Sequence, residues 1–360
     1  MKLFPWSFVM STIRTPRQQT ILDFVAKHPM ATRDQIQRAV AEHFSKSSKV
    51  TLLRDISALL CDGLLEREGV TKGSLYRLTD AAQLLSSVDV NQYFSKPMDE
   101  RLLRRTVFDF EIFPLLKGLL NEKEKESFAL LNETFRKKRD DLTPGLIKKE
   151  LERITIELAW KSSSIEGNTY TLLETERLLK MNIATQRRSR EETLMVLNHK
   201  NALNFILEKP SYFRKITPRK IIEIHQLLSD GLDIPNGVRT RIVSINGTNY
   251  RPLENSSKIE EALTKLCEVL NRTKNTLERA LIATLMISYI QPFEDANKRT
   301  GRMLGNAILL SDDYCPMSYR SVDEVEYMKS VLLFYEQQNA TYFKELFLTQ
   351  FTEAVERHFG

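Results

Sequence analysis

Apolar side chains recur at intervals of three and four residues along most of the chain, which predicts a mostly α-helical protein. The apolar stretch 277–290 predicts a buried helix. Because Pro292 disfavours helical geometry at the preceding residue, we expect that helix to end at Gln291. Another helix is predicted from about Asn297. Further helical segments are expected at 101–138, 145–160, 170–208, 217–230, 258–273 and 322–356.

The first 80 residues follow a different pattern. Three amphipathic stretches after Pro16 predict three helices, the second capped by Thr32 and the third covering about 48–60. The inward residues of the third helix are predicted to be Val50, Leu53, Ile56, Leu59 and Leu60. Segments 64–68 and 74–78 flank a turn and predict a short β-hairpin. Three helices followed by a hairpin resemble the bacterial winged helix-turn-helix domains.

In winged helix domains the third helix enters the major groove of DNA. The resemblance therefore implies DNA contacts, made by Lys49, Thr51, Arg54 and, on the wing, Lys72. Residues 1–90 carry 12 Lys and Arg against 9 Asp and Glu, a balance of only +3. This small excess leaves open the alternative that the module docks proteins or dimerises.

Composition and length set the broad class of the protein. A chain of 360 residues with 42% hydrophobic content has room for two domains, predicted here as 1–90 and 91–360 with a polar linker at 86–100. No apolar run is long enough for a membrane span, and the segment 2–10 is too short for a signal sequence. Three scattered cysteines suit a reducing compartment, so we expect a cytoplasmic protein with no membrane partner.

Residues 291–302 carry the strongest chemical signal, Gln-Pro-Phe-Glu-Asp-Ala-Asn-Lys-Arg-Thr-Gly-Arg. The loop leads into a helix start, and unpaired amides there suit anionic oxygens. These amides are expected at Ala296, Asn297 and Lys298. Arg299 and Arg302 lie three residues apart and should share a helix face. Amides, two arginines and one carboxylate for a divalent ion together predict a triphosphate site, the alternative being a basic helix start with solvated charges.

The same run resembles the signature of Fic proteins, His-x-Phe-x-Asp/Glu-Gly/Ala-Asn-Gly/Lys-Arg-x-x-Arg. Enzymes of that family move AMP from ATP to a hydroxyl group of a target protein. The resemblance implies ATP and Mg²⁺ as ligands, with Asp295 on the metal, Asn297 and the adjacent amides on the α-phosphate, and Arg299 and Arg302 on the β- and γ-phosphates. Lys298 stands where many members have Gly.

The first position of the signature departs from the family pattern, because Gln291 replaces the histidine. That histidine takes the proton of the attacking hydroxyl, and a glutamine amide cannot. Losing a general base typically costs ~10²–10⁴-fold in rate. Nucleotide binding is therefore expected to survive better than transfer. Neither His199 nor His225 has a spacing typical of a substitute base, and both are predicted to be structural.

A second motif, Ser-Ser-Ser-Ile-Glu-Gly-Asn, occupies residues 162–168. It resembles the family's inhibitory motif, placed here on a helix near 160–170 ahead of a core near 195–310. The resemblance implies that Ser162, Glu166 and Gly167 form an inhibitory element, with the glutamate paired to Arg302 in the place of the γ-phosphate. The alternative is an ordinary helix end followed by a turn.

Residues 241–250 alternate polar and apolar side chains around Asn246-Gly247, which predicts a β-hairpin with a type I′ turn. The hairpin resembles the family's flap, which pairs with the main chain of the target protein. An ordinary surface hairpin is the alternative. Gly301 and Gly305 share one helix face and are predicted to let a neighbouring helix approach closely.

The leading hypothesis is therefore a Fic-family protein with an all-helical domain and a β-hairpin flap, preceded by a winged helix domain. It would bind ATP with magnesium, be restrained by Glu166, and transfer AMP slowly or not at all. One alternative is a nucleotide-sensing, DNA-binding regulator, and another is an inactive interaction scaffold. A homodimer is compatible with the sequence, which identifies neither the target protein nor the DNA site.

Overall fold

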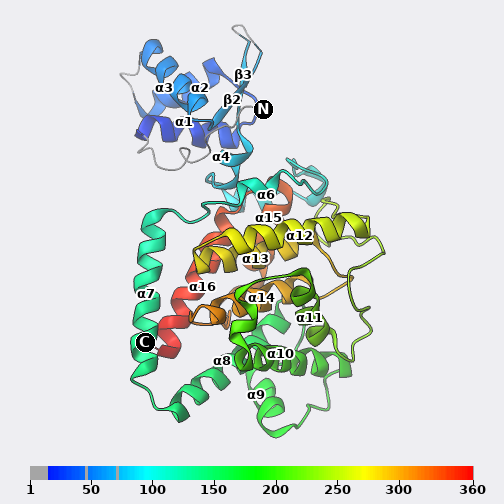
Figure 1. The fold of residues 1–360 in the computed structure, drawn as a ribbon. Helices are drawn as coiled ribbons and strands as arrows, with labels where there is room; N and C mark the ends of the chain where they lie inside the picture. The colour runs from blue at the N-terminus through cyan, green and yellow to red at the C-terminus, as the bar shows by residue number, and fades with distance from the viewer. Residues whose placement is uncertain (1–14, 45–47, 70–72, 360) are drawn as a thin grey trace.

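The computed structural model describes residues 15–44, 48–69 and 73–359 and is mostly helical, as the sequence predicts. Figure 1 shows a small N-terminal module above a larger helical domain. The predicted wing residue Lys72 and the segment 2–10 lie outside the described residues.

The N-terminal module has the predicted three helices and hairpin, with one short strand added. Its elements are α1 (Pro16–Lys27), β1 (Ala31–Thr32), α2 (Arg33–His43), α3 (Lys49–Cys61), β2 (Leu65–Glu68) and β3 (Leu75–Leu78). The strands form an antiparallel sheet in the order β1-β3-β2. Thr32 caps α2 as expected, because its side chain accepts the Gln35 amide. The assignment of this module to the winged helix class stays a prediction.

The inward face of α3 differs from the prediction. Val50 and Leu53 are 76% and 42% exposed, whereas Leu52 is buried together with Ile56 and Leu59. Asp55 is also buried because it pairs with Arg17 of α1. The ion pair lets a charged residue occupy an inward position, which apolar spacing alone cannot show.

The segment that joins the two parts is not a free linker. It contains α4 (Asp80–Leu84), α5 (Val90–Phe94), η2 (Met98–Glu100) and α6 (Ile112–Leu115), so the helix predicted over 101–138 is wrong before residue 122. The Tyr93 hydroxyl donates to Glu336 at 2.6 Å, and Asn339 Nδ2 donates to the Ser86 carbonyl at 2.9 Å. Within the stretch itself, the Arg104 amide donates to the Glu336 carbonyl at 2.7 Å, so this main-chain donor is used by the helical domain and not by a local helix.

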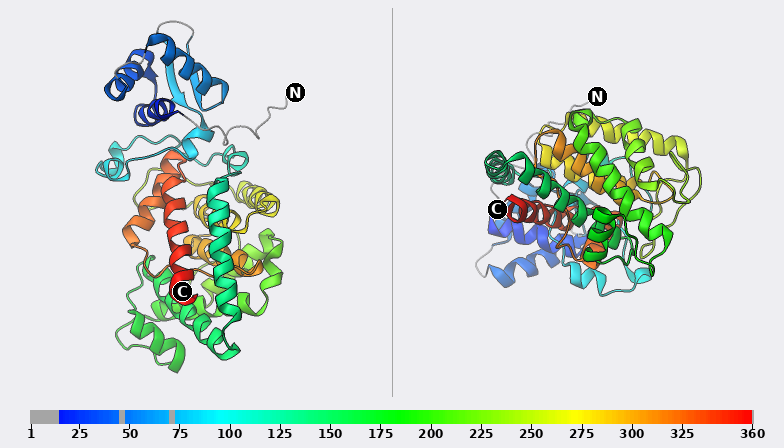
Figure 2. Two further views of the ribbon diagram at one scale, coloured as in Figure 1. Left: turned by 90° about the vertical axis from the view of Figure 1, so that its left-hand side faces the viewer. Right: turned by 90° about the horizontal axis from the view of Figure 1, so that it is seen from below.

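The helical domain is built from long amphipathic helices around a central one. They are α7 (Glu122–Asp140), α8 (Pro144–Ser164), α9 (Leu172–Met181), α10 (Arg190–Glu208), η3 (Pro210–Arg214), α11 (Pro218–Ser229), α12 (Ser256–Arg272), α13 (Thr276–Ile290), α14 (Asn297–Ser311), α15 (Glu324–Gln337) and α16 (Thr341–Phe359). Every residue of α13 is buried, as its apolar sequence predicts. Helices α7 and α16 run side by side along one flank (Figure 2).

Two predicted helical segments are interrupted at left-handed residues. Asn182 (φ 55°) ends α9, and Gln338 (φ 49°) ends α15. Asparagine tolerates this conformation better than most residues, so the break at 182 has a local cause. The break at Gln338 has no such signal in the sequence.

Close packing of α14 on α13 depends on the two glycines, as predicted. A Cβ atom on Gly301 would lie 2.7 Å from the Thr284 carbonyl oxygen, and one on Gly305 would overlap the Thr284 hydroxyl. The helix that begins at the signature loop is thereby pressed against the most buried helix of the domain.

The hairpin predicted at 241–250 is wrong, because its two arms do not pair as strands. A turn is present at Asn246–Gly247, but only Gly247 has a positive φ (83°), whereas a type I′ turn needs two. The return arm pairs instead with the joining segment: the Arg251 amide donates to the Thr106 carbonyl at 2.8 Å, and Val107 forms a bridge with Arg251. Within the described residues, no helix is long and apolar enough to cross a membrane.

Candidate functional site

The signature loop is held by the side chain of Asn297. Its Nδ2 donates to the Phe293 carbonyl and to Gln291 Oε1, and its Oδ1 accepts the Phe293 amide, all at 2.9 Å. The loop starts and ends at left-handed residues, Gln291 (φ 52°) and Ala296 (φ 63°). The two residues reverse the chain between α13 and α14, so α13 ends where Pro292 predicts.

The start of α14 leaves main-chain donors free. Of the three predicted amides, that of Ala296 is taken by Asp295 Oδ1 at 2.6 Å. The amides of Asn297 and Lys298 have no hydrogen-bond partner within 15–44, 48–69 and 73–359. Two donors at the positive end of a 15-residue helix remain available for an anion.

Gln291 is buried and both ends of its amide are engaged. Its Nε2 donates to the Ser288 carbonyl at 2.7 Å and lies 3.3 Å from the Tyr335 hydroxyl, while Oε1 accepts from Asn297. Because a carbonyl can only accept, the orientation of the amide is fixed. Gln291 therefore stabilises the loop and has no atom that takes up a proton at neutral pH.

Arg299 is a buried cation with unused donors. Its side chain is 2% exposed, and Nη2 donates to Asp295 Oδ2 at 3.0 Å. Its Nε and Nη1 are buried and have no partner among the described residues. Burial lowers the pKa of Arg299, although the nearby Asp295 and Glu166 oppose that effect. Buried donors of this kind usually have an acceptor, so these two nitrogens are available to an anion.

Arg302 has different partners from Arg299, although the two arginines lie only three residues apart. Its Nε donates to the Ser162 hydroxyl at 2.9 Å, and its Nη2 donates to the Ser162 carbonyl at 2.9 Å and to Glu166 Oε1 at 2.8 Å. The Nη1 atom is buried without a partner in the described part of the chain. Its guanidinium lies 5.1 Å from the centre of the Tyr327 ring.

Glu166 lies between two cations. Oε1 meets Arg302, and Oε2 lies 3.1 Å from Lys298 Nζ. Burial alone would raise the pKa of Glu166, but Arg302 and then Lys298 lower it to about 2. The carboxylate is thus ionised at neutral pH and neutralises part of the charge of Arg302 and Lys298.

Helix α8 positions Glu166 by ending just before it. The helix closes at Ser164, so Glu166 lies in the following turn and not on the helix itself as predicted. Gly167 has φ 91° and completes that turn. The Asn168 side chain donates to the Glu192 carbonyl at 2.8 Å, which holds the turn against α10.

His199 joins this group, although the sequence predicts only a structural role for it. Its Nδ1 lies 2.7 Å from the Met195 carbonyl and its Nε2 lies 2.8 Å from the Ser162 hydroxyl. The carbonyl requires a proton on Nδ1, so Nε2 accepts from Ser162. Burial lowers the pKa of His199 to about 3, which keeps the ring neutral. The contact spans 37 residues, and no spacing rule reveals it.

Asp295 suits a magnesium ion bound mainly through phosphates. Its side chain is 65% exposed and lies just before α14 begins. The described residues contain no cluster of three or more His, Cys, Asp or Glu side chains arranged for a metal. Magnesium commonly uses one or two carboxylates together with substrate phosphates and water, so a single aspartate is sufficient.

Two neighbours of the loop complete the site. His225 stacks on Phe293 at 3.8 Å with both ring nitrogens unpartnered among the described residues, which agrees with a packing role. Arg239, which sequence reasoning missed, is 2% exposed and donates to the carbonyls of Gln291, Arg241 and Leu253. It ties the 241–253 segment to the loop without any carboxylate partner in the described chain.

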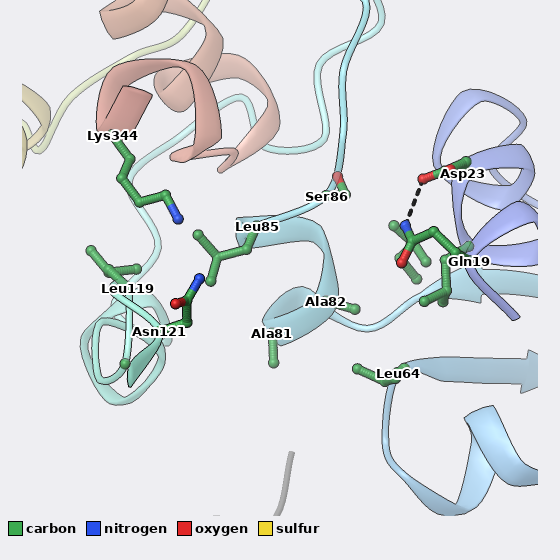
Figure 3. Close-up of a pocket in the computed structure, with 13 residues that line it drawn as sticks. Gln19, Asp23, Leu64, Ala81, Ala82, Leu85, Ser86, Leu119, Asn121 and Lys344 are labelled. Atoms are coloured by element: carbon green, nitrogen blue, oxygen red, sulfur yellow. Dashed lines mark hydrogen bonds between the residues drawn. The ribbon is translucent and has the colours of Figure 1, made fainter. Parts of the chain in front are cut away.

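Other predicted residues lie elsewhere. Lys49 and Arg54 are exposed on α3, in the N-terminal module and away from α14 (Figure 1), and the Thr51 hydroxyl contacts the α3 cap residue Ser48 at 2.9 Å. A pocket at the junction between the module and the helical domain, lined by Gln19, Leu85 and Lys344 among others, contains none of the predicted site residues (Figure 3).

Comparisons with known proteins match part of the helical domain to one family. Residues 215–309 match the model of the Fic/DOC family. The protein adenylyltransferase Fic of Nematostella vectensis is 29% identical over 192 residues, which cover 50% of this chain and 43% of the relative. The protein adenylyltransferase fic-1 of Caenorhabditis elegans is 27% identical over 176 residues, 47% of this chain and 34% of the relative. The chain thus covers less than half of these relatives' length.

Solved structures share the fold. Residues 134–508 of Fic-1 from C. elegans superpose with a TM-score of 0.55 at 18% identity, over 89% of this chain and 92% of that one. A Fic domain containing signaling protein from Bacteroides thetaiotaomicron gives 0.53 at 21% identity, over 64% of this chain and 93% of that one. At such identities the likeness concerns the fold alone. Residues 215–309, which include the signature loop, match the Fic/DOC family, and the fold of the chain agrees with that match.

Proposed function

We propose that this protein binds ATP with a divalent cation where the 291–296 loop meets α14. The observation that carries the proposal is Arg299, a buried guanidinium with two unpartnered nitrogens in the described structure, close to the free amides of Asn297 and Lys298. A buried cation without sufficient acceptors is costly, and phosphate oxygens would satisfy it. The relatives named protein adenylyltransferases support ATP as the nucleotide.

The site is organised to pass AMP to a hydroxyl group of a target protein. The hydroxyl oxygen would bond to the α-phosphorus, the bond to the pyrophosphate oxygen would break, and the hydroxyl proton must be accepted. Asp295 would hold magnesium, which neutralises phosphate charge when bound. Gln291 cannot accept the proton, so transfer is expected to be slow or absent. The exposed arm from Arg241 to Ile245 is the proposed docking edge for the target.

Glu166 is proposed to inhibit this site. It engages Arg302, and only one nitrogen of that guanidinium remains unpartnered among the described residues. A triphosphate that needs Arg302 must first displace the carboxylate. The free energy needed to break the Glu166–Arg302 pair therefore lowers the apparent affinity of the protein for ATP.

Titration calorimetry with ATP and magnesium tests the proposal. Glu166→Gly should bind more tightly than wild type, and adding Arg299→Ala should abolish that binding. Arg272→Ala, a change at an exposed arginine of α12, is the matched control and should bind as wild type does. A folded Glu166→Gly variant that does not bind ATP would refute nucleotide binding.

Transfer is tested separately with labelled ATP and cell extract. Gln291→His combined with Glu166→Gly should label a protein, whereas Glu166→Gly alone should label it weakly or not at all. If the folded double variant labels nothing while still binding ATP, the protein is a nucleotide sensor or an inactive scaffold.

A second function, DNA binding, is proposed for the N-terminal module. Lys49 and Arg54 on α3 are exposed and have no ion-pair partner among the described residues. Unpaired cations on one helix suit a phosphate backbone. The chain should retard a duplex at low salt, and Lys49→Ala/Arg54→Ala should weaken that retardation. No retardation by wild type would leave protein docking or dimerisation as the role of the module.

A further inference from the structure

Lys298 and Arg302 form a two-cation clamp on one carboxylate. They lie four residues apart on α14, so their side chains project from the same face of the helix. Each takes a different oxygen of Glu166: Arg302 Nη2 lies 2.8 Å from Oε1, and Lys298 Nζ lies 3.1 Å from Oε2. Arg299, which is also near, is directed to Asp295 instead.

We propose that Lys298 is a positioning residue that holds Glu166 over Arg302 and so strengthens the closed state of the nucleotide site. The inference rests on the proposed function and adds Lys298 as a second residue, beside Arg302, that holds Glu166. It gives a role to the lysine at the signature position where glycine is common, a residue that cannot form this contact.

The contact between Lys298 and Glu166 strengthens the closed state because both side chains are largely buried. The side chains of Glu166 and Lys298 are 15% and 20% exposed, so water screens their attraction less than that of a surface pair. A single ion pair to Arg302 would leave Oε2 without a cation partner. The contact with Lys298 fixes both oxygens, and the carboxylate must lose two partners before a phosphate replaces it.

The alternative role for Lys298 is direct attraction of the nucleotide. A lysine near the first turn of α14 would then raise the affinity for ATP, and its removal would weaken binding. The two roles predict opposite signs for the same substitution, because a clamp favours the closed state and a phosphate ligand favours the bound state.

The test measures ATP affinity in four proteins: wild type, Lys298→Met, Glu166→Gly and the double variant. Methionine keeps the length and helix propensity of lysine but removes the charge. We expect Lys298→Met to bind ATP about threefold to tenfold more tightly than wild type. In the Glu166→Gly background the same change should give no gain, because the carboxylate that it releases is absent.

Two further variants control the result. Lys298→Arg keeps a cation within reach of Oε2 and should retain wild-type affinity. Lys180→Met removes another lysine that pairs with a glutamate on a helix, Glu176, and should have no effect. Circular dichroism and melting temperature establish that each variant is folded.

The outcomes separate the inference from the function on which it rests. If Lys298→Met binds ATP no more tightly than wild type, or more weakly, while Glu166→Gly binds well, the clamp is refuted and nucleotide binding stands. A gain of equal size in both backgrounds also refutes the clamp, since it would not pass through Glu166. If none of the four folded proteins binds ATP, both proposals fail.

Discussion

His199 Nε2 lies 2.8 Å from the Ser162 hydroxyl, and the same oxygen accepts a hydrogen bond from Arg302 Nε at 2.9 Å. The Ser162 hydroxyl donates its hydrogen bond to the neutral ring, so the lone pairs of the hydroxyl oxygen face the guanidinium. A histidine of α10 thereby sets the orientation of the arginine that Glu166 holds.

Because the three side chains act in series, their substitutions should not be additive. We expect Ser162→Ala and His199→Leu each to lower the free energy of unfolding by about 1–3 kcal/mol, since each leaves a buried polar group unpaired. The double variant should cost less than the sum by about 0.5–2 kcal/mol. Urea denaturation at pH 7.5 measures all three. Strict additivity would show that the contact is incidental.

The loss of folding stability in acid should depend on His225. Burial lowers its pKa from 6.5 to about 4, so the unfolded chain binds a proton that the folded chain excludes between those pH values. Its contribution to stability is complete above pH 6.5 and is lost as the pH falls toward 4, amounting to about 3 kcal/mol.

His225→Phe should remove that loss while keeping the stack on Phe293. The variant should gain about 1 kcal/mol at pH 7.5, because two buried nitrogens without partners in the described structure disappear. Unfolding free energies measured from pH 7.5 to 4.5 check the slope. Parallel curves for the variant and wild type would contradict the prediction.

The close approach of α13 and α14 predicts different outcomes for the two glycines. Alanine at Gly301 meets the main chain of Thr284, whereas alanine at Gly305 meets its hydroxyl group. Each substitution should cost about 1–3 kcal/mol through overpacking. Adding Thr284→Ala should restore most of the stability lost in Gly305→Ala and little of that lost in Gly301→Ala. Thermal denaturation of the two single glycine variants, the two double variants and Thr284→Ala measures these differences. If Thr284→Ala restored the stability of both glycine variants equally, the result would be inconsistent with these contacts.

Arg239 should matter for the order of the 241–253 segment. Its removal leaves three carbonyl groups without their donor, and we expect Arg239→Ala to cost about 2–4 kcal/mol. Limited proteolysis should cut the segment faster in the variant. Arg241→Ala, where the side chain is 79% exposed, serves as the control and should change stability by less than about 0.5 kcal/mol. Equal protease resistance of Arg239→Ala and wild type would show that the three hydrogen bonds of Arg239 do not order the segment.

The sequence was most informative where structure depends on neighbours along the chain. Pro292 marked the end of α13, Thr32 the start of α2, and the pair Gly301 and Gly305 the close helix contact. Each rests on local geometry: a ring that clashes, a hydroxyl that caps, or a missing Cβ atom. The prediction of a hairpin at Asn246–Gly247 was wrong because pairing also needs a second strand in register. Arg251 instead forms a bridge with Val107 of the joining segment.

The charged groups of the site followed from the sequence, but much of their arrangement followed from tertiary structure. The run from Gln291 to Arg302 names the charged groups and fixes which of them share a helix face. The resemblance also implied that Glu166 pairs with Arg302, whereas packing decided that Lys298 joins that carboxylate and that His199 supports Arg302 through Ser162. The contacts of Arg302 and Lys298 with Glu166 join segments more than one hundred residues apart, and burial there makes each unpaired charge costly enough to select one arrangement.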